Sequence, residues 1–159
     1  MRHAKSSWGN LNLADHDRPL NERGVKSGFV LGNWLREKNY LPDEALVSSA
    51  TRTQETYQLL KLDLSPTILP ELYHSSSEEL LEAIATASGT TLLVVAHNPG
   101  IGDLALRLAR IMRDHPDHDR FGTYPTGATF VIIYEADSWA DLDLSNGVIK
   151  DFITPRELS

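Results

Sequence analysis

Short apolar runs alternate along the chain with longer segments in which apolar residues lie four positions apart. Four-residue spacing is typical of amphipathic helices, and short apolar runs between turn residues are typical of strands. The pattern predicts helices from Asn21 to about Lys38, from Thr51 to Leu60, from Ser77 to about Ala87 and from Asn98-Pro99 to about Met112. It predicts strands at Glu44–Ser48, Thr67–Leu69, Thr91–Ala96, Thr129–Tyr134 and Val148–Ile153.

This alternation favours an α/β fold, a three-layer α/β/α sandwich with a mostly parallel central sheet and helices on both faces. Thr91–Ala96 is apolar without interruption, as expected for a strand that is covered on both faces. Gly28 and Gly32 weaken the first predicted helix, because an interior glycine costs about 1 kcal/mol relative to alanine. We find no repeat, low-complexity stretch or linker, so residues 1–159 are expected to form a single domain.

Composition narrows the classes of function. The chain has 159 residues, no cysteine and a formal net charge of −7. The lack of cysteine excludes disulfides, thiolate metal ligands and a cysteine nucleophile. The acidic balance argues against binding nucleic acid, and no apolar run approaches the roughly 20 residues that span a bilayer. We therefore expect a cytoplasmic protein without a nucleic-acid or membrane partner, and the pattern indicates no particular oligomeric state.

Basic residues and histidines gather in three short segments, at the places where such a fold carries its chemistry. These segments are Arg2–Ser6, Ser48–Thr53 and Ala96–Gly100. The second and third follow predicted strands and lead into predicted helices, so together the three would bring two arginines and two histidines to one crevice. In an acidic chain such a cluster indicates an anionic ligand, and arginine is suited to bidentate recognition of phosphate oxygens. The helix after His97 would add backbone N–H donors.

The same segments resemble the motifs of a known family. Arg2–Ser6 is similar to the Arg-His-Gly-type signature of the histidine phosphatase superfamily, and Asp15–Gly24 is similar to the segment that follows it in small bacterial SixA-type phosphohistidine phosphatases. Ser48–Thr56 resembles the second arginine segment of the superfamily, and Ala96–Pro99 resembles its second histidine segment. From the order and spacing of these motifs the chain is identified as a SixA-like member, which implies the phosphoglycerate mutase-like fold.

The resemblance implies a metal-independent phosphatase that uses no cofactor. By this resemblance His3 is the nucleophile and becomes a covalent phosphohistidine, which water then hydrolyses. Arg2, Arg52 and His97 would surround the transferred phosphoryl group and stabilise its charge. Further expected phosphate contacts are Arg18, Ser6 and Asn98.

The two histidines are expected to differ in their protonation state. His3 must be neutral at its attacking nitrogen, whereas His97 is most useful as a cation beside the phosphate, and flanking arginines should lower the pKa of both. A bound phosphate dianion would raise the pKa of His97 again, and the rate optimum is expected at mildly acidic to neutral pH. Many family members place a carboxylic acid after the third strand to protonate the leaving oxygen, and Glu71 is the candidate at that position.

The expected substrate is phosphohistidine in a protein. Its P–N bond breaks with an imidazole leaving group, which can be protonated without a dedicated carboxylic acid. Larger members of the superfamily insert a helical cap that selects small substrates, and the segment between Leu62 and Thr91 has no obvious room for one. An open pocket is therefore expected, which suits a phosphorylated side chain on another protein.

Three rival interpretations stay open. A small phosphorylated substrate would make the protein a phosphomonoesterase or a mutase of the same superfamily, and a chain that binds phosphate or phosphoprotein without catalysis would not need His3. Metal-dependent hydrolysis rests on Asp15–Asp17 and His115–Asp119, which concentrate ligand types. Both segments lie in predicted loops, so solvated polar loops are favoured for both.

The amino-terminal end departs from the family pattern. In the family an apolar strand precedes the Arg-His pair and lies centrally in the sheet, whereas this sequence begins one residue before Arg2. A missing central strand would leave unpaired backbone groups and an apolar gap. We expect a start codon assigned downstream of the true one, with a truncated chain or an unusual pairing of the first residues as alternatives.

Overall fold

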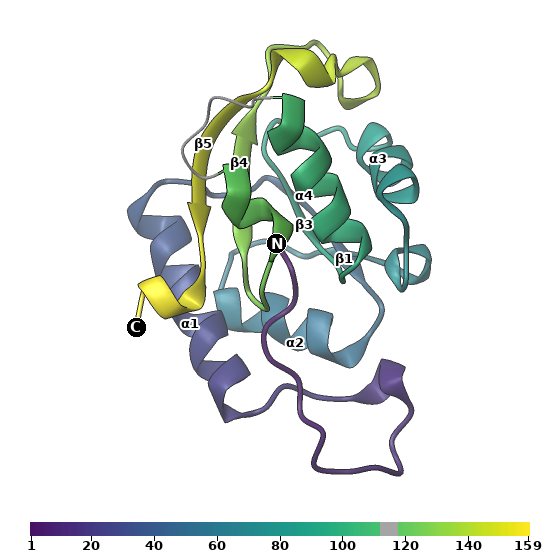
Figure 1. Ribbon diagram of the computed structural model, residues 1–159, viewed down its shortest axis with the longest axis vertical. Coiled ribbons are helices and arrows are strands. Elements are labelled where there is room, and N and C mark those ends of the chain that lie inside the picture. The colour runs from purple at the N-terminus through teal and green to yellow at the C-terminus, as the bar shows by residue number, and fades with distance from the viewer. Residues whose placement is uncertain (112–117) are drawn as a thin grey trace.

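A parallel sheet of three strands, in the order β2-β1-β3, lies at the centre of the structure (Figure 1). The structure is a computed structural model that describes residues 1–111 and 118–159. Its helices and strands are α1 (Glu22–Glu37), β1 (Glu44–Ser48), α2 (Thr51–Leu60), β2 (Thr67–Leu69), α3 (Ser77–Ala85), β3 (Leu92–Val95), α4 (Gly100–Ile111), β4 (Thr129–Ile133) and β5 (Val148–Ile153). β4 and β5 form a separate antiparallel pair with an irregularity between Val131 and Ile132.

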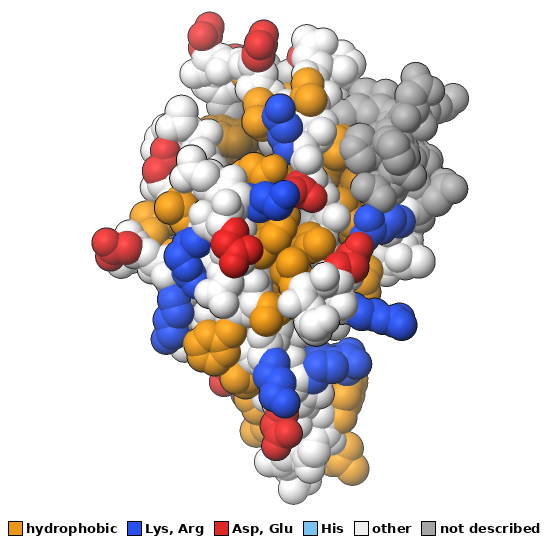
Figure 2. Space-filling model, turned by 90° about the vertical axis from the view of Figure 1, so that its left-hand side faces the viewer, with side chains coloured by type: hydrophobic (Ala, Val, Ile, Leu, Met, Phe, Trp, Pro, Cys, Tyr) orange, Lys and Arg blue, Asp and Glu red, His pale blue; other side chains and the backbone are white. Residues whose placement is uncertain are grey.

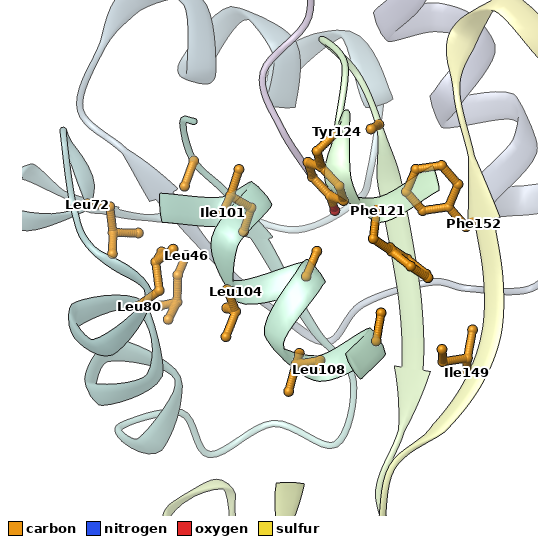
Figure 3. Close-up of a cluster of buried hydrophobic side chains, with 14 residues drawn as sticks. Leu46, Leu72, Leu80, Ile101, Leu104, Leu108, Phe121, Tyr124, Ile149 and Phe152 are labelled. Carbon is orange, nitrogen blue, oxygen red and sulfur yellow. The ribbon is translucent and has the colours of Figure 1, made fainter. Parts of the chain in front are cut away.

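The helices cover the parallel sheet on both faces. α1 packs on α2 and α3 packs on α4, and the side chains of β1 alternate between the two resulting cores. Ala45 and Val47 lie in the core with α1 and α2, whereas Leu46 lies in the core with α3 and α4. Figure 3 shows this second core, in which Leu80 of α3 and Leu104 of α4 approach Leu46. The expected α/β fold with a mostly parallel sheet is confirmed.

The glycines of α1 allow close contact with α2 instead of merely weakening the helix. A Cβ on Gly28 would lie 2.6 Å from Cβ of Leu59, and a Cβ on Gly32 would overlap the carbonyl oxygen of Leu60. The two helices therefore meet at a distance that only glycine permits. This packing offsets the conformational cost of glycine within a helix.

The helix starts differ slightly from the prediction. The sequence pattern predicts Ser77 as the residue that caps the third helix, whereas the N-cap of α3 is Ser76, because Ser76 and Glu79 form a reciprocal capping box. α4 begins at Gly100, one residue after Pro99. The predicted end of α4 at Met112 lies outside the described residues.

The first three residues connect the two sheets. Arg2 forms a parallel bridge with Ala96 of the segment that follows β3, and its N–H donates to the carbonyl of Ala128 at 2.9 Å. The Met1 ammonium donates to the carbonyl of Val94 at 2.9 Å, and burial lowers the pKa of this group to about 5. The first residues are thus paired, and a cavity of about 670 Å³ with polar and apolar lining residues lies between β3 and β4.

The face that carries α1 and β5 is a mixed polar surface. Figure 2 shows Lys and Arg side chains interspersed there with Asp, Glu and apolar side chains, and no histidine is visible on it.

Within the described ranges, no helix is both long enough and apolar enough to cross a membrane.

Candidate active site

Histidines and arginines from separate segments meet at the carboxyl ends of β1 and β3. The rings of His3 and His97 lie side by side, with centroids 5.1 Å apart. Arg52, in the first turn of α2, donates from Nε to Nε2 of His3 at 3.4 Å. Arg2 precedes His3 and interacts electrostatically with Arg52. The structure thus brings together the two histidines and two arginines that the sequence places at strand ends, and His3, Arg52 and His97 are buried.

The backbone determines the tautomer of His3. Its Nδ1 lies 2.7 Å from the carbonyl oxygen of Ala4, which can only accept a hydrogen bond, so Nδ1 carries the proton and Nε2 a lone pair. Burial lowers the pKa of His3 to about 4, and the charges of Arg52 and Arg2 act in the same direction, whereas the hydrogen bond to Ala4 opposes them. At neutral pH His3 is therefore an uncharged imidazole, the form in which histidine is a nucleophile.

His97 presents an N–H group while it is neutral. Its Nε2 lies 2.7 Å from Oγ of Ser48, and this hydroxyl also accepts from the N–H of Ala50 at 3.5 Å. The hydroxyl proton of Ser48 has no other acceptor in the described chain, so it is donated to Nε2, and Nδ1 carries the ring proton. Nδ1 is buried without a hydrogen-bond partner. Burial lowers the pKa of His97 to about 3, and His3 and Arg52 add to the shift. For both histidines, burial lowers the pKa more than the neighbouring arginines do, which the sequence suggests as the cause.

Arg2 and Asn98 share one backbone acceptor. Nη1 of Arg2 and Nδ2 of Asn98 donate to the carbonyl of Tyr124, at 3.0 Å and 3.2 Å. Nε of Arg2 is buried without a partner, as is Oδ1 of Asn98. Burial, and then the charge of Arg52, lowers the pKa of Arg2. The arginine is therefore held in place through one nitrogen while a second N–H donor in the interior stays unpaired.

Asp15 orients Arg52, whereas the sequence pattern suggests it only as a candidate metal ligand. It lies in a single 3₁₀ turn, Asp15–Asp17, and its carboxylate accepts from Arg18 at 2.8 Å, Arg52 at 3.0 Å and the hydroxyl of Tyr73 at 2.7 Å. Its carbonyl accepts a further bond from Arg52 at 2.6 Å. These contacts, that of Tyr73 first, hold the pKa of Asp15 well below its usual range. An acidic residue three positions before Arg18 is the only local signal.

Arg18 is engaged on every side of its guanidinium group. Nε donates to the carbonyl of Ser7 at 2.9 Å and Nη2 donates to Oγ of Ser6 at 2.8 Å, in addition to the bond to Asp15. The ring of Trp8 stacks 3.2 Å from the guanidinium carbon. Arg18 and Ser6 are thus buried partners of each other, and their expected contacts with phosphate stay predictions.

An aromatic rim, formed by Tyr73 and His74, borders the buried histidines on one side. The ring of Tyr73 meets the rings of His74, His16 and His97, at centroid distances of 3.9 Å, 4.8 Å and 5.5 Å. Glu71 lies in the turn just before this rim, exposed to solvent and without a hydrogen bond or ion pair to any described residue. The structure brings Tyr73 and His74 to the pocket, and it does not bring Glu71 into contact with His3 or His97.

The segments proposed for a metal have other contacts or lie outside the structure. Among residues 1–111 and 118–159, no group of three or more histidines and carboxylates is arranged to hold a metal ion. In Asp15–Asp17 the Asp15 carboxylate pairs with arginines, and His16 bonds to Oγ of Ser49 at 2.9 Å. In His115–Asp119, residues 115–117 lie outside the described part of the chain.

Comparison with known proteins identifies this arrangement. The model of the histidine phosphatase superfamily (branch 1) matches residues 1–77. The phosphohistidine phosphatase SixA of Escherichia coli K12 is 30% identical over 117 residues, which cover 68% of this chain and 71% of that protein. The chain belongs to the histidine phosphatase superfamily.

Two further relatives cover almost the whole chain. An uncharacterized protein of Mycobacterium tuberculosis (strain ATCC 25618 / H37Rv) is 34% identical over 160 residues, which cover 98% of this chain and 100% of that protein. A solved structure from Nakamurella multipartitia, named for phosphohistidine phosphatase SixA, superposes with a TM-score of 0.86 at 28% identity, over 98% of this chain and 93% of that chain. Within the superfamily this chain therefore lies on the SixA-like branch.

Proposed function

We propose that this protein is a phosphohistidine phosphatase, which transfers a phosphoryl group from a phosphohistidine side chain to His3 and then to water. The observation that carries the proposal is that a neutral histidine nucleophile lies close to buried N–H donors that have no hydrogen-bond partner. The lone pair on Nε2 of His3 faces the guanidinium of Arg52, whose Nε donates to it at 3.4 Å, while Nε of Arg2 and Nδ1 of His97 are buried donors without partners. A phosphoryl group has three oxygens that would accept from such donors.

The chemistry follows from these positions. Nε2 of His3 attacks phosphorus, the bond from phosphorus to the leaving nitrogen breaks, and its electron pair stays on the departing imidazole. Arg2, Arg52 and His97 donate to the phosphoryl oxygens and stabilise the charge of the transition state. Water then attacks phosphorus, the Nε2–P bond breaks, and its electron pair returns to His3 as phosphate departs.

The surroundings of the pocket support a protein substrate. Between β2 and β3 the described chain has one α-helix, α3. This helix packs on α4 and is not an inserted cap of the kind that selects small substrates. The rim residue His74 is exposed while His3 and His97 are buried, so a side chain carried on another protein would enter beside His74. The relative from Escherichia coli is named as a phosphohistidine phosphatase.

The test is hydrolysis of a phosphohistidine peptide in the presence of EDTA by the 159-residue chain and by His3→Ala. We expect EDTA-resistant turnover by the wild type, a phosphoenzyme trapped by acid-free quenching, and loss of both in His3→Ala. Lys61→Gly, an exposed position at the end of α2, serves as the control for purification and folding.

Other outcomes select the rivals. Equal turnover by His3→Ala would refute the nucleophile assignment. A higher kcat/KM for small phosphomonoesters than for the peptide would favour a phosphomonoesterase, and formation of a second phosphomonoester would favour a mutase. Phosphate binding without turnover by the wild type would favour a binding protein.

A further inference from the structure

Tyr73 and His74 lie at the edge of the active site, directly after the 3₁₀ turn Pro70–Leu72. Tyr73 has contacts on several sides, His74 packs against it, and the ring nitrogens of His74 have no hydrogen-bond partner among the described residues.

Tyr73 is fixed by contacts on several sides. Its hydroxyl donates to Oδ2 of Asp15 at 2.7 Å, and the guanidinium carbon of Arg52 lies 5.8 Å from its ring centroid. The edges of His16 and His97 meet the ring at interplanar angles of 84° in both cases. The ring is therefore a rigid support that shares its partners with the phosphoryl pocket.

His74 is held against this support in a costly backbone conformation. Its φ of 59° lies in the left-handed region, which costs a residue other than glycine about 1 kcal/mol or more. Its ring lies 3.9 Å from that of Tyr73 and 6.4 Å from that of His97, by centroids. The side chain is exposed, and its ring nitrogens have no hydrogen-bond partner among the described residues. Strain of this kind is found at functional sites more often than elsewhere.

The substrate places a second nitrogen atom on this side of the pocket. In phosphohistidine one ring nitrogen is bonded to phosphorus, and the other lies across the ring, farther from phosphorus. Since the leaving nitrogen departs opposite the attacking Nε2 of His3, a substrate ring that enters beside Tyr73 and His74 places its far nitrogen on that side of the site. A proton on that nitrogen lets the ring leave as neutral imidazole instead of as an anion.

We infer that His74 is a catalytic residue, whose imidazolium ring gives a proton to the far nitrogen of the departing imidazole. As Nε2 of His3 bonds to phosphorus, the P–N bond of the substrate breaks and its electron pair stays on the leaving nitrogen. The proton from His74 resides on the opposite nitrogen, so the product is a neutral histidine side chain. In the second step His74 takes a proton from the attacking water, which restores the imidazolium ring. Proton exchange by a positioned imidazole of this kind is general acid–base catalysis.

The inference rests on the proposed phosphohistidine phosphatase activity and explains a preference within it. In a phosphate ester the leaving oxygen is bonded directly to phosphorus, deep in the pocket. In phosphoramidate the leaving nitrogen has no ring and no second nitrogen. A proton donor at the rim therefore assists phosphoimidazole compounds and neither of the other two classes.

The test compares three substrates in wild type, His74→Asn and His74→Gly. Asparagine and glycine tolerate a left-handed backbone, so both variants should fold. The substrates are phosphoimidazole, phosphoramidate, and phosphoimidazole methylated at its far nitrogen, which leaves as neutral methylimidazole without taking a proton. Lys61→Gly is the matched control, because Lys61 is an exposed residue with a φ of 53° at the end of α2.

We expect both His74 variants to lower kcat for phosphoimidazole roughly 100-fold, the lower end of the range for general acid catalysis. Turnover of the methylated substrate and of phosphoramidate should stay at the wild-type level, as should every activity of Lys61→Gly. An equal loss on the methylated substrate would mean that His74 only stacks on the ring, and would overturn the inference while the proposed function stands. No loss on phosphoimidazole would also overturn it alone. A wild type that turns over phosphoramidate through His3 but not phosphoimidazole would overturn the inference together with the phosphohistidine assignment.

Discussion

Acid should destabilise this protein through the two buried histidines of its pocket. His3 and His97 are 7% and 3% exposed, and their pKa values are lowered to about 4 and about 3, mainly by burial. In an unfolded chain the pKa of histidine is about 6.5. The unfolded state therefore binds more protons between about pH 3 and 6.5, and the free energy of unfolding falls as pH drops through this window. Their full contribution is present above pH 6.5, and linkage gives a loss of about 2 kcal/mol for each histidine between pH 7 and pH 5.

Urea unfolding at pH 7 and at pH 5 measures this loss. The reference is the double variant His3→Gln/His97→Gln, which keeps every other titrating group. These include the Met1 ammonium, whose lowered pKa acts in the same direction. Between the two pH values the wild type should lose about 4 kcal/mol more than the double variant. An equal loss in both proteins would show that the two histidines are not held neutral by the fold, and the description of the nucleophile would be wrong.

Further changes test single contacts. Ser48→Ala removes the partner of His97 Nε2, so kcat for a phosphohistidine peptide should fall roughly 10-fold, and nitrogen NMR should show the His97 ring proton no longer confined to Nδ1. Asp15→Asn should lower the free energy of unfolding, measured in urea, by about 1–2 kcal/mol. The loss stays small because the carboxylate is 44% exposed and its ion pairs are partly screened. The same change should lower kcat, because Arg52 loses the partner that orients it. Gly32→Ala should cost about 3 kcal/mol by the same measurement, since its Cβ meets backbone, whereas Gly122→Ala meets nothing within 4 Å and should be close to neutral.

The central part of the site could be predicted from the sequence because parallel strands end at one edge of a sheet. Arg52 follows β1 and His97 follows β3, and the two strands are direct neighbours in register. Once the strands are placed, their following residues must lie close together. The contact between Arg52 and His3 then needs only that the first segment pairs beside β3, which it does through the bridge between Arg2 and Ala96.

The helix α1 shows where periodicity is insufficient. Val25 and Phe29 have the four-residue spacing of a buried stripe, yet they are 38% and 44% exposed. The face that meets α2 carries Gly28 and Gly32 instead. Apolar spacing predicts that a helix forms, but the buried face depends on how close the neighbouring helix can approach, and glycine permits the closest approach.

The partners of Arg52 could not be predicted for a different reason. Asp15 and Tyr73 are 58 positions apart, and both lie in short irregular segments whose place depends on the whole fold. No local pattern links them. A carboxylate beside a phosphate pocket also looks unfavourable from the sequence, because it would repel the ligand. In the structure its charge is balanced by Arg18 and Arg52, so it orients donors at a smaller electrostatic cost.

Burial divides the histidines of the pocket into two kinds, and this division explains how similar side chains serve different steps. His3 and His97 are enclosed, so both are neutral: one offers a lone pair at Nε2 and the other an N–H at Nδ1, as set by Ala4 and Ser48. A cationic His97 is therefore not needed to contact phosphate. The proton that the leaving group requires has to come from a residue that remains in contact with solvent, and at this rim the exposed histidine is His74. A nucleophile kept uncharged in the interior and a proton donor kept at the surface can then operate at the same pH.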